Sequence, residues 1–249
     1  MKTLNLAAYH FSEIPDPGAV RETLAETGET LGVRGTILVT PEGLNAFVAG
    51  PEPACRAMLE ALRAVPGFAG MVAKESWSES LPFRRFKVKV KREIIRMDHP
   101  TVQPALGRAP AVSAQTLATW LDRGRDDEGR PVVMLDTRND FEVDLGAFEN
   151  AIDWRIRKFT EFPEAVKAHA ADLAGKTVVS YCTGGIRCEK AAIYMQSMGL
   201  SNVLQLDGGI LKYFEETGGR HFRGTCFVFD ERASLTPELA PTASATGQA

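Results

Sequence analysis

Residues 177–190 have the sequence TVVSYCTGGIRCEK, and this stretch decides the fold of the second half of the chain. The apolar, β-branched run 177–181 predicts a buried strand. It ends at Cys182, two glycines follow, and from Ile186 apolar residues recur at helical spacing as far as Met198. A tight loop therefore joins the carboxyl end of a strand to the amino end of a helix, where unpaired backbone N–H groups attract an anion.

The anion that this loop can hold is the thiolate of Cys182. Arg187, separated from Cys182 by four residues, adds a permanent positive charge. Loop amides and a guanidinium both lower the pKa of a thiol, so we expect a reactive cysteine. The alternative is a buried cysteine at a strand end that packs as a small hydrophobic residue. The convergence of strand, glycines, helix and arginine on one sulfur favours the reactive cysteine.

A resemblance to a known family follows from the same residues. The loop is one residue shorter than the loop of cysteine phosphatases, and a shorter loop suits a single extra atom, such as the outer sulfur of a persulfide. The segment YCTGGIRCEKAAIYM resembles the active-site loop of rhodanese domains, and CTGGIRCEK is similar to the tRNA uridine hydroxylases of the TrhO (YceA) family. The resemblance covers nearly the whole chain.

That resemblance implies oxygen-dependent hydroxylation of the wobble uridine (position 34) of tRNA to 5-hydroxyuridine, with molecular oxygen as co-substrate. It implies that Cys182 forms the persulfide intermediate and that Arg187 stabilises the anionic sulfur. The remaining residues of the active-site loop are Thr183, Gly184, Gly185 and Ile186. The implied partners are the anticodon arm of tRNA and a sulfur donor.

Three further residues are candidate accessory groups: Cys188, Asp136 and Arg138. The segment 135–142 resembles the rhodanese D-x-R-x-x-x-E signature, carried by Asp136, Arg138 and Glu142. An arginine between two carboxylates is typical of an ion-pair brace that holds loops, and we favour this over a catalytic role, although Asp136 can still face the pocket. Cys188 either resolves a persulfide or disulfide on Cys182 or packs against the sheet. Cys226 and Cys55 are expected to be core residues.

The first hundred residues predict a ferredoxin-like α+β domain, residues 1–97, in the order βαββαβ. The expected elements are strands Leu4–Phe11, Gly35–Thr40 and Asn45–Ala49, helices that begin at Pro17 and Pro51, and a closing strand. We place the closing strand in the stretch 84–92, where Phe86, Val88 and Val90 alternate with basic residues.

That basic stretch is the second candidate site. Seven basic residues fall within residues 84–96 of a chain whose net charge is −3. Arg85, Lys87, Lys89 and Lys91 share one face of the expected strand and are candidate tRNA-binding residues, because such a row attracts phosphate backbones. The alternative, a solvated face whose lysines discourage edge pairing, is equally consistent with charge alone. No aromatic-rich run accompanies the stretch, so base stacking is not indicated there.

Residues 98–112 carry prolines and no apolar period, and we expect a linker in which His99 is structural or faces solvent. Residues 113–222 predict a rhodanese-like α/β domain with a mostly parallel sheet and helices on both faces. Its expected strands are 131–136, 151–154, 177–181 and 203–206, and its expected helices are 139–145, 162–169, 186–198 and 209–216, after one that Ser113 caps. In the C-terminal segment 223–249 we expect disorder from about residue 234, where Ala, Ser, Thr, Pro and Gly dominate.

Composition limits the remaining possibilities. No apolar run approaches the roughly 18 residues of a membrane span, and no basic-then-apolar leader is present, so we expect a cytoplasmic protein without membrane contact. Four cysteines in a chain of this length do not predict a disulfide framework, and no Cys-x2-Cys pair predicts a zinc site. We recognise no motif for a metal, flavin or nucleotide cofactor in the sequence, which leaves the oxidising species unexplained.

Two other hypotheses remain beside hydroxylation. The protein can be a sulfurtransferase that carries a persulfide on Cys182, in which case thiosulfate and cyanide yield thiocyanate at high turnover. It can also be a noncatalytic tRNA-binding module, in which case Cys182→Ala retains full activity in cells.

Overall fold

The computed structural model describes residues 2–242, and the chain divides into two compact units. The first contains the residues up to 96 together with 104–106, and the second contains 97–103 and the residues from 107 on. The segment expected as a linker is therefore shared between them: Pro104–Leu106 is a short 3-10 helix of the first unit, and Ala111–Val112 is a strand, β6, of the second. None of the helices within 2–242 combines the length and apolarity that crossing a membrane requires.

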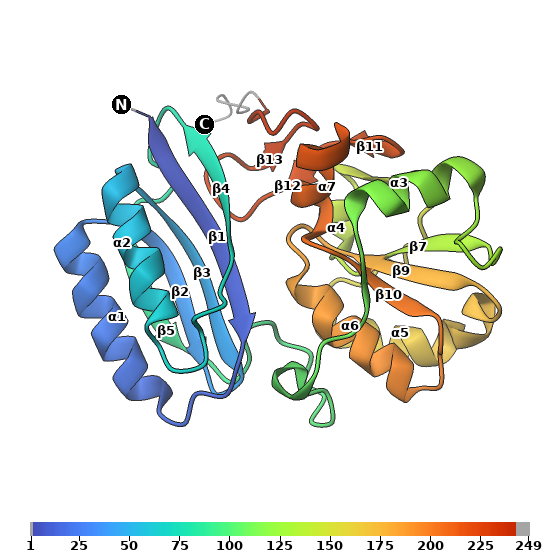
Figure 1. The fold of residues 1–249 in the computed structure, drawn as a ribbon, viewed down its shortest axis with the longest axis horizontal. Coiled ribbons are helices and arrows are strands. Elements are labelled where there is room, and N and C mark those ends of the chain that lie inside the picture. Colours follow the sequence, from blue (N-terminus) through green and yellow to red (C-terminus); the bar gives the residue numbers. More distant parts are fainter. Residues whose placement is uncertain (1, 243–249) are drawn as a thin grey trace. The chain divides into compact units, whose positions relative to one another are not determined.

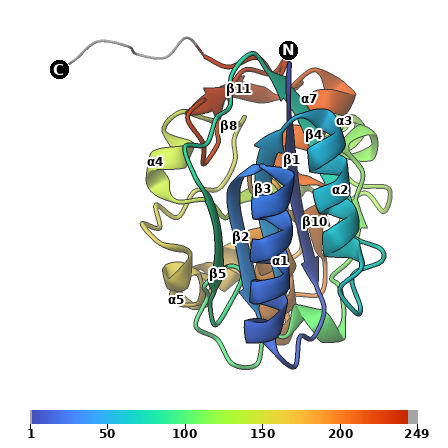
Figure 2. The ribbon, with the colours of Figure 1, turned by 90° about the vertical axis from the view of Figure 1, so that its left-hand side faces the viewer.

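The first unit is a five-stranded sheet with α1 and α2 on one face (Figures 1 and 2). Its elements are β1 (Thr3–Phe11), α1 (Pro17–Leu31), β2 (Arg34–Thr40), β3 (Gly43–Gly50), α2 (Glu52–Arg63), β4 (Ala73–Ser78) and β5 (Phe86–Val90). The strand order is β4-β1-β3-β2-β5, and all neighbours are antiparallel except β2 and β5. The ferredoxin-like fold predicted from the sequence is confirmed.

One prediction in this unit is wrong. The strand that completes βαββαβ is β4, which pairs with β1, and not the basic stretch. β4 has few apolar residues and is half-buried, so hydrophobic periodicity did not reveal it. The basic strand β5 is instead a fifth, edge strand parallel to β2.

Two local features hold β5 in place. Gly28 of α1 lies directly under the Phe86 ring, where a Cβ would come within 2.2 Å of the ring. Phe86 and Val88 pack against the buried core of the unit, whereas Lys87 and Lys89 are exposed, as the alternation predicted. Val90 departs from the pattern and is 48% exposed, because it lies at the end of the strand.

The second unit is a four-stranded parallel sheet, β6-β10-β9-β7, with α3 and α7 on one face and α5 and α6 on the other (Figure 1). Its main elements are α3 (Ala114–Arg123), β7 (Val132–Asp136), α4 (Asp140–Val143), α5 (Phe162–His169), β9 (Thr177–Tyr181), α6 (Ile186–Ser197), β10 (Val203–Leu206) and α7 (Gly209–Thr217). Two short pairs complete it: β8 (Gly146–Phe148) with β11 (Phe222–Gly224), and β12 (Cys226–Phe227) with β13 (Ser234–Leu235).

The expectations for this unit hold except at two places. Residues 151–154 form no strand and contribute only a bridge from Ile152 to Leu135 of β7. The disorder expected from residue 234 is also wrong as far as residue 242, because β13 pairs with β12 and buries Ser234 and Leu235. Residues 243–249 lie outside the described residues. His99 contacts the Tyr194 ring at 4.7 Å, which fits a structural role.

Candidate functional site

Cys182 lies at the carboxyl end of β9, in a loop that leads into α6. Gly185, the residue before α6, has φ +98°, a conformation that favours glycine. This turn points the backbone N–H of Gly185 at Cys182, and the N–H donates to Sγ over 3.1 Å. The predicted cradle of strand end, glycine turn and helix start is present, with the sulfur fully buried.

The amino end of α7 holds this loop from the other side. Ile210 N–H donates to the carbonyl of Cys182 at 3.0 Å, and Leu211 N–H donates to the carbonyl of Thr183 at 3.1 Å. Gly209 has φ +67° and lies so close that a Cβ there would come within 2.5 Å of the Cys182 carbonyl oxygen. Because α7 binds the carbonyls of the loop, the amides of the loop remain available to the sulfur.

Arg187 is fixed by an ion pair that sequence reasoning did not foresee. Its guanidinium donates to both carboxylate oxygens of Glu142, at 2.6 and 2.7 Å, and both side chains are buried. The same carboxylate accepts the N–H of Asn139 at 3.1 Å. Glu142 therefore restrains Arg187 beside Cys182, and burial of the pair is compensated by bidentate geometry.

The electrostatics of the site favour a thiolate. Burial raises the pKa of Cys182, but hydrogen bonding from the Cys188 thiol, the charge of Arg187 and the N–H groups of Arg187 and Gly185 outweigh it. The pKa of Cys182 consequently lies well below its ordinary value. A lowered pKa favours the thiolate, which is the nucleophilic form of cysteine.

Cys188, in the first turn of α6, is the thiol partner of Cys182. Burial and donation to the Cys182 sulfur raise the pKa of Cys188 well above its ordinary value, so it keeps its proton. Its sulfur also lies 3.7 Å from Thr137 Oγ1, whose own proton goes to the Tyr181 carbonyl at 2.9 Å. Cys182 and Cys188 are both free thiols here. The spacing thus brings the two sulfurs together, and their hydrogen bond lowers the pKa of Cys182 and raises that of Cys188.

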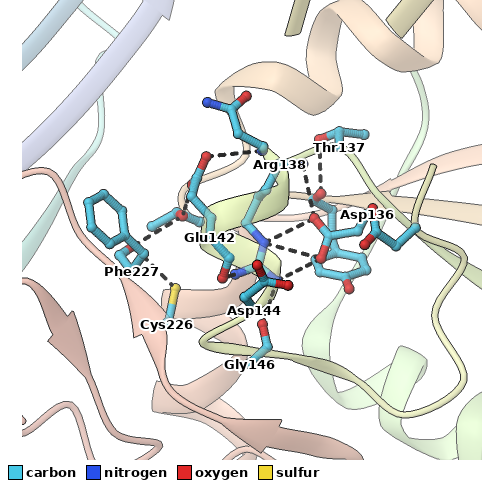
Figure 3. A network of polar contacts seen from close by, with 12 residues as sticks. Asp136, Thr137, Arg138, Glu142, Asp144, Gly146, Cys226 and Phe227 are labelled. Atoms are coloured by element: carbon cyan, nitrogen blue, oxygen red, sulfur yellow. Dashed lines mark hydrogen bonds and ion pairs between the residues drawn. The ribbon is translucent and has the colours of Figure 1, made fainter. Parts of the chain in front are cut away.

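Asp136 and Arg138 form the ion-pair brace, shown in Figure 3. Arg138 Nη2 donates to Asp136 Oδ2 at 2.6 Å, and neither side chain is exposed. The guanidinium also donates to the carbonyl of Gly146 at 2.6 Å, which fixes the segment after α4. The third residue of the signature behaves differently from our expectation, because the Glu142 carboxylate pairs with Arg187 and only its backbone carbonyl accepts from Arg138.

The C-terminal segment lies against the active-site loop. Thr183 Oγ1 donates to the carbonyl of Phe227 in β12 at 3.3 Å. Cys226 is fully buried, and burial raises its pKa to about 12. Cys55, in α2 of the first unit, is likewise buried, with a pKa of about 11. Both are core thiols, as expected.

The candidate tRNA-binding residues lie in the first unit. Arg85, Lys87, Lys89 and Lys91 are all exposed, along or beside edge strand β5. Within residues 2–242 no group of three or more His, Cys, Asp or Glu side chains has the arrangement of a metal site.

Sequence reasoning missed three contributors to the site: Thr137, Glu142 as the partner of Arg187, and Gly209. Gly209 carried a usable signal, since the pair Gly208-Gly209 follows a buried strand and precedes a helix, as Gly184-Gly185 does. The partner of Arg187 had none, because 45 residues separate it from Glu142.

Comparisons with known proteins agree with this geometry. The UPF0176 acylphosphatase like domain matches residues 3–94, and the Rhodanese-like domain matches residues 114–216. Proteins named tRNA uridine(34) hydroxylase are similar over nearly the whole chain. The one from Variovorax paradoxus is 63% identical over 97% of this chain and 92% of its own length. Those from Delftia acidovorans and Bordetella avium are 62% and 59% identical over 96% and 97% of this chain, and 91% and 100% of their own lengths. With this identity at full length, two matching domains and a cysteine loop of the rhodanese type, the chain belongs to the tRNA uridine(34) hydroxylase family.

Proposed function

We propose that this protein hydroxylates uridine 34 of tRNA at carbon five and that Cys182 is its reactive group. The observation that carries the proposal is the buried Cys182 thiol in the loop before α6, whose pKa the Gly185 amide, Arg187 and Cys188 lower. The relatives that match over nearly the whole chain are named tRNA uridine(34) hydroxylase, which supports the substrate and the reaction. An anionic sulfur in an amide cradle is suited to carry an outer sulfur atom as a persulfide.

The reaction is a two-electron oxidation of the base, with molecular oxygen as co-substrate. One oxygen atom enters the C5–H bond as a hydroxyl group. The second leaves as water, which requires two further electrons and two protons. A thiol reductant supplies these electrons and protons when two thiols become one disulfide. In total, uridine, dioxygen and two thiols give 5-hydroxyuridine, water and a disulfide.

The experiment that tests the activity is mass spectrometry of tRNA nucleosides. Cells that lack the gene should lose 5-hydroxyuridine and its derivatives, wild type should restore them, and Cys182→Ser should not. Cys226→Ser is the matched control, because it removes an equally buried thiol. Unchanged 5-hydroxyuridine after deletion would refute the proposed function.

The basic row of β5 is proposed to bind the phosphate backbone of the anticodon arm. Its lysines are exposed and lie on an edge strand whose other face packs on the core. Replacing Lys87, Lys89 and Lys91 with alanine should weaken tRNA binding. It should also make the binding less dependent on salt, because about three fewer counterions are released. Removing three lysines of the second unit, Lys158, Lys167 and Lys176, alters the net charge equally and is the control. Unchanged affinity and salt slope in the β5 variant would exclude this strand from binding.

A further inference from the structure

Three phenylalanine rings form a chain at the edge of the site. Phe141 of α4 and Phe227 of β12 pack edge to face with their centroids 5.2 Å apart, and Phe227 packs in the same way on Phe229 at 4.9 Å. The outer two rings remain exposed, Phe141 by 45% and Phe229 by 57%. Below, the three are called the aromatic chain.

The aromatic chain is tied to the active-site loop by two routes. The carbonyl of its central residue, Phe227, accepts the hydroxyl of Thr183, the residue after Cys182. Phe141 directly precedes Glu142, the carboxylate that holds Arg187. Figure 3 shows Phe227 next to Glu142. The exposed rings thus lie beside the loop that carries the reactive sulfur.

A purely structural role does not account for the exposed rings. The segment is already attached by hydrogen bonds, such as Thr225 N–H to the Leu145 carbonyl at 2.9 Å, and by the pairing of β12 with β13. Its buried side chains are Cys226, Val228 and Leu235. Fastening the segment needs the central ring, but it gains little from outer rings that keep about half of their surface in water.

We propose that the aromatic chain is a stacking platform for unpaired bases of the RNA loop that presents its uridine to Cys182. This inference rests on the proposed function and adds to it the group that recognises the base. A base that reacts with a protein must leave its stack, and aromatic rings beside the site replace that lost stacking. The occupant is single-stranded RNA, because only unpaired bases offer their faces. The basic row of β5 supplies charge and no ring, so the two surfaces read different parts of the RNA.

The test is binding of a fluorescent anticodon stem-loop with uridine at position 34. A second RNA has abasic residues at position 34 and its two neighbours, which keep every phosphate but remove the base faces. The double variant Phe141→Leu/Phe229→Leu should bind the first RNA roughly tenfold more weakly and the abasic RNA as wild type does. Phe229→Trp, which keeps a ring, should retain wild-type affinity.

The matched control is Met198→Ala. Met198 is an apolar side chain of the same unit that is 44% exposed, just beyond the carboxyl end of α6, whereas the site lies at the amino end of that helix. It should bind both RNAs as wild type does. The platform is excluded if the leucine variant binds the uridine RNA normally, or if it loses the same factor with both RNAs. These outcomes are independent of nucleoside analysis in cells, which tests the hydroxylation itself.

Discussion

Cys182 and Cys226 lie in neighbouring regions of one unit, are equally buried, and have opposite properties. Neither sulfur has any exposed surface. Burial raises the pKa of Cys226 to about 12, whereas the pKa of Cys182 is lowered well below its ordinary value. The Cys226 thiol donates to the carbonyl of Phe227 at 3.7 Å. Burial raises its pKa more than the charge of Arg138 and a hydrogen bond with Thr183 lower it.

The difference shows that burial alone makes a cysteine inert. Cys182 overcomes the same desolvation because donors surround it: the Gly185 amide, the Arg187 guanidinium and the Cys188 thiol. Each donor has its own structural support, namely the α7 contact, Glu142 and Thr137. Removing one support at a time should therefore show which contact lowers the pKa of Cys182.

The largest difference should appear when each thiol is replaced by a hydroxyl. The serine hydroxyl keeps its proton at neutral pH and carries no sulfur, so Cys182→Ser should abolish 5-hydroxyuridine formation. Cys226→Ser should stay within about twofold of wild type, since it changes packing only. The measurement is the 5-hydroxyuridine content of tRNA incubated with each purified variant. Equal activity of the two variants would remove the distinction.

Glu142→Gln should lower stability and lower the pKa of Cys182 further. Losing the carboxylate leaves the Arg187 charge buried without a partner, which costs about 3–5 kcal/mol of unfolding free energy. The uncompensated charge also attracts the thiolate more strongly. Urea unfolding and the pH dependence of iodoacetamide labelling measure the two effects. Asp136→Asn is the control, because it leaves Arg138 unpaired at a similar stability cost and should leave the labelling profile of Cys182 unchanged.

Gly209→Ala should displace the active-site loop. The new Cβ would lie 2.5 Å from the Cys182 carbonyl oxygen, and the positive φ adds strain, for a total of about 1–3 kcal/mol. The pKa of Cys182 should rise because the loop amides move. Gly218→Ala has nearly the same φ, +66°, but open space around its Cβ. Gly218→Ala should lose stability through backbone strain and leave the pKa of Cys182 unchanged. A shifted pKa of Cys182 in this control would show that the α7 contact is not the cause.

Cys188→Ala should raise the pKa of Cys182, because one of the donors to the thiolate is lost. Cys188→Ser keeps a donor of similar size and should restore much of the difference. The pH profile of alkylation gives both values. A profile that neither substitution moves would show that the Cys188 proton does not reach Cys182.

The smallest effect concerns stability in alkali. The pKa of Cys226 rises from 9.0 to about 12 in the folded chain, so the unfolded chain releases this proton first. Stability should therefore fall as the pH rises above 9.0, by about 1 kcal/mol at pH 10 from this thiol alone. For Cys182, whose pKa is lowered on folding, the sign reverses: its contribution is complete above the unfolded pKa of 9.0 and is lost as the pH falls from there through the folded pKa. Cys226→Ser should remove only the alkaline loss in urea titrations.

Local pattern was sufficient for most of the fold. Helix α5 begins and ends where its periodicity does, at Phe162 and His169. Asp16 and Ser113 cap α1 and α3 through side-chain hydrogen bonds, as their residue types indicate. Two of the failures are elements whose burial comes from distant partners: β4, which pairs with β1, and β13, which pairs with β12 across a six-residue loop. An edge strand without apolar alternation carries no local signal.

By itself, the sequence determined the local surroundings of Cys182, the candidate reactive residue. Strand, glycine turn, helix and arginine are contiguous in 177–190, so their geometry follows from short-range rules. The tertiary structure alone decided which distant residues complete the site, because Glu142, Thr137 and Gly209 approach Cys182, Cys188 and Arg187 from other elements. It also decided that Phe141 and Phe229 both pack on Phe227, beside the active-site loop. Contacts within a few ångströms together stabilise a buried thiolate. The separation of residues along the sequence does not predict which of them make those contacts.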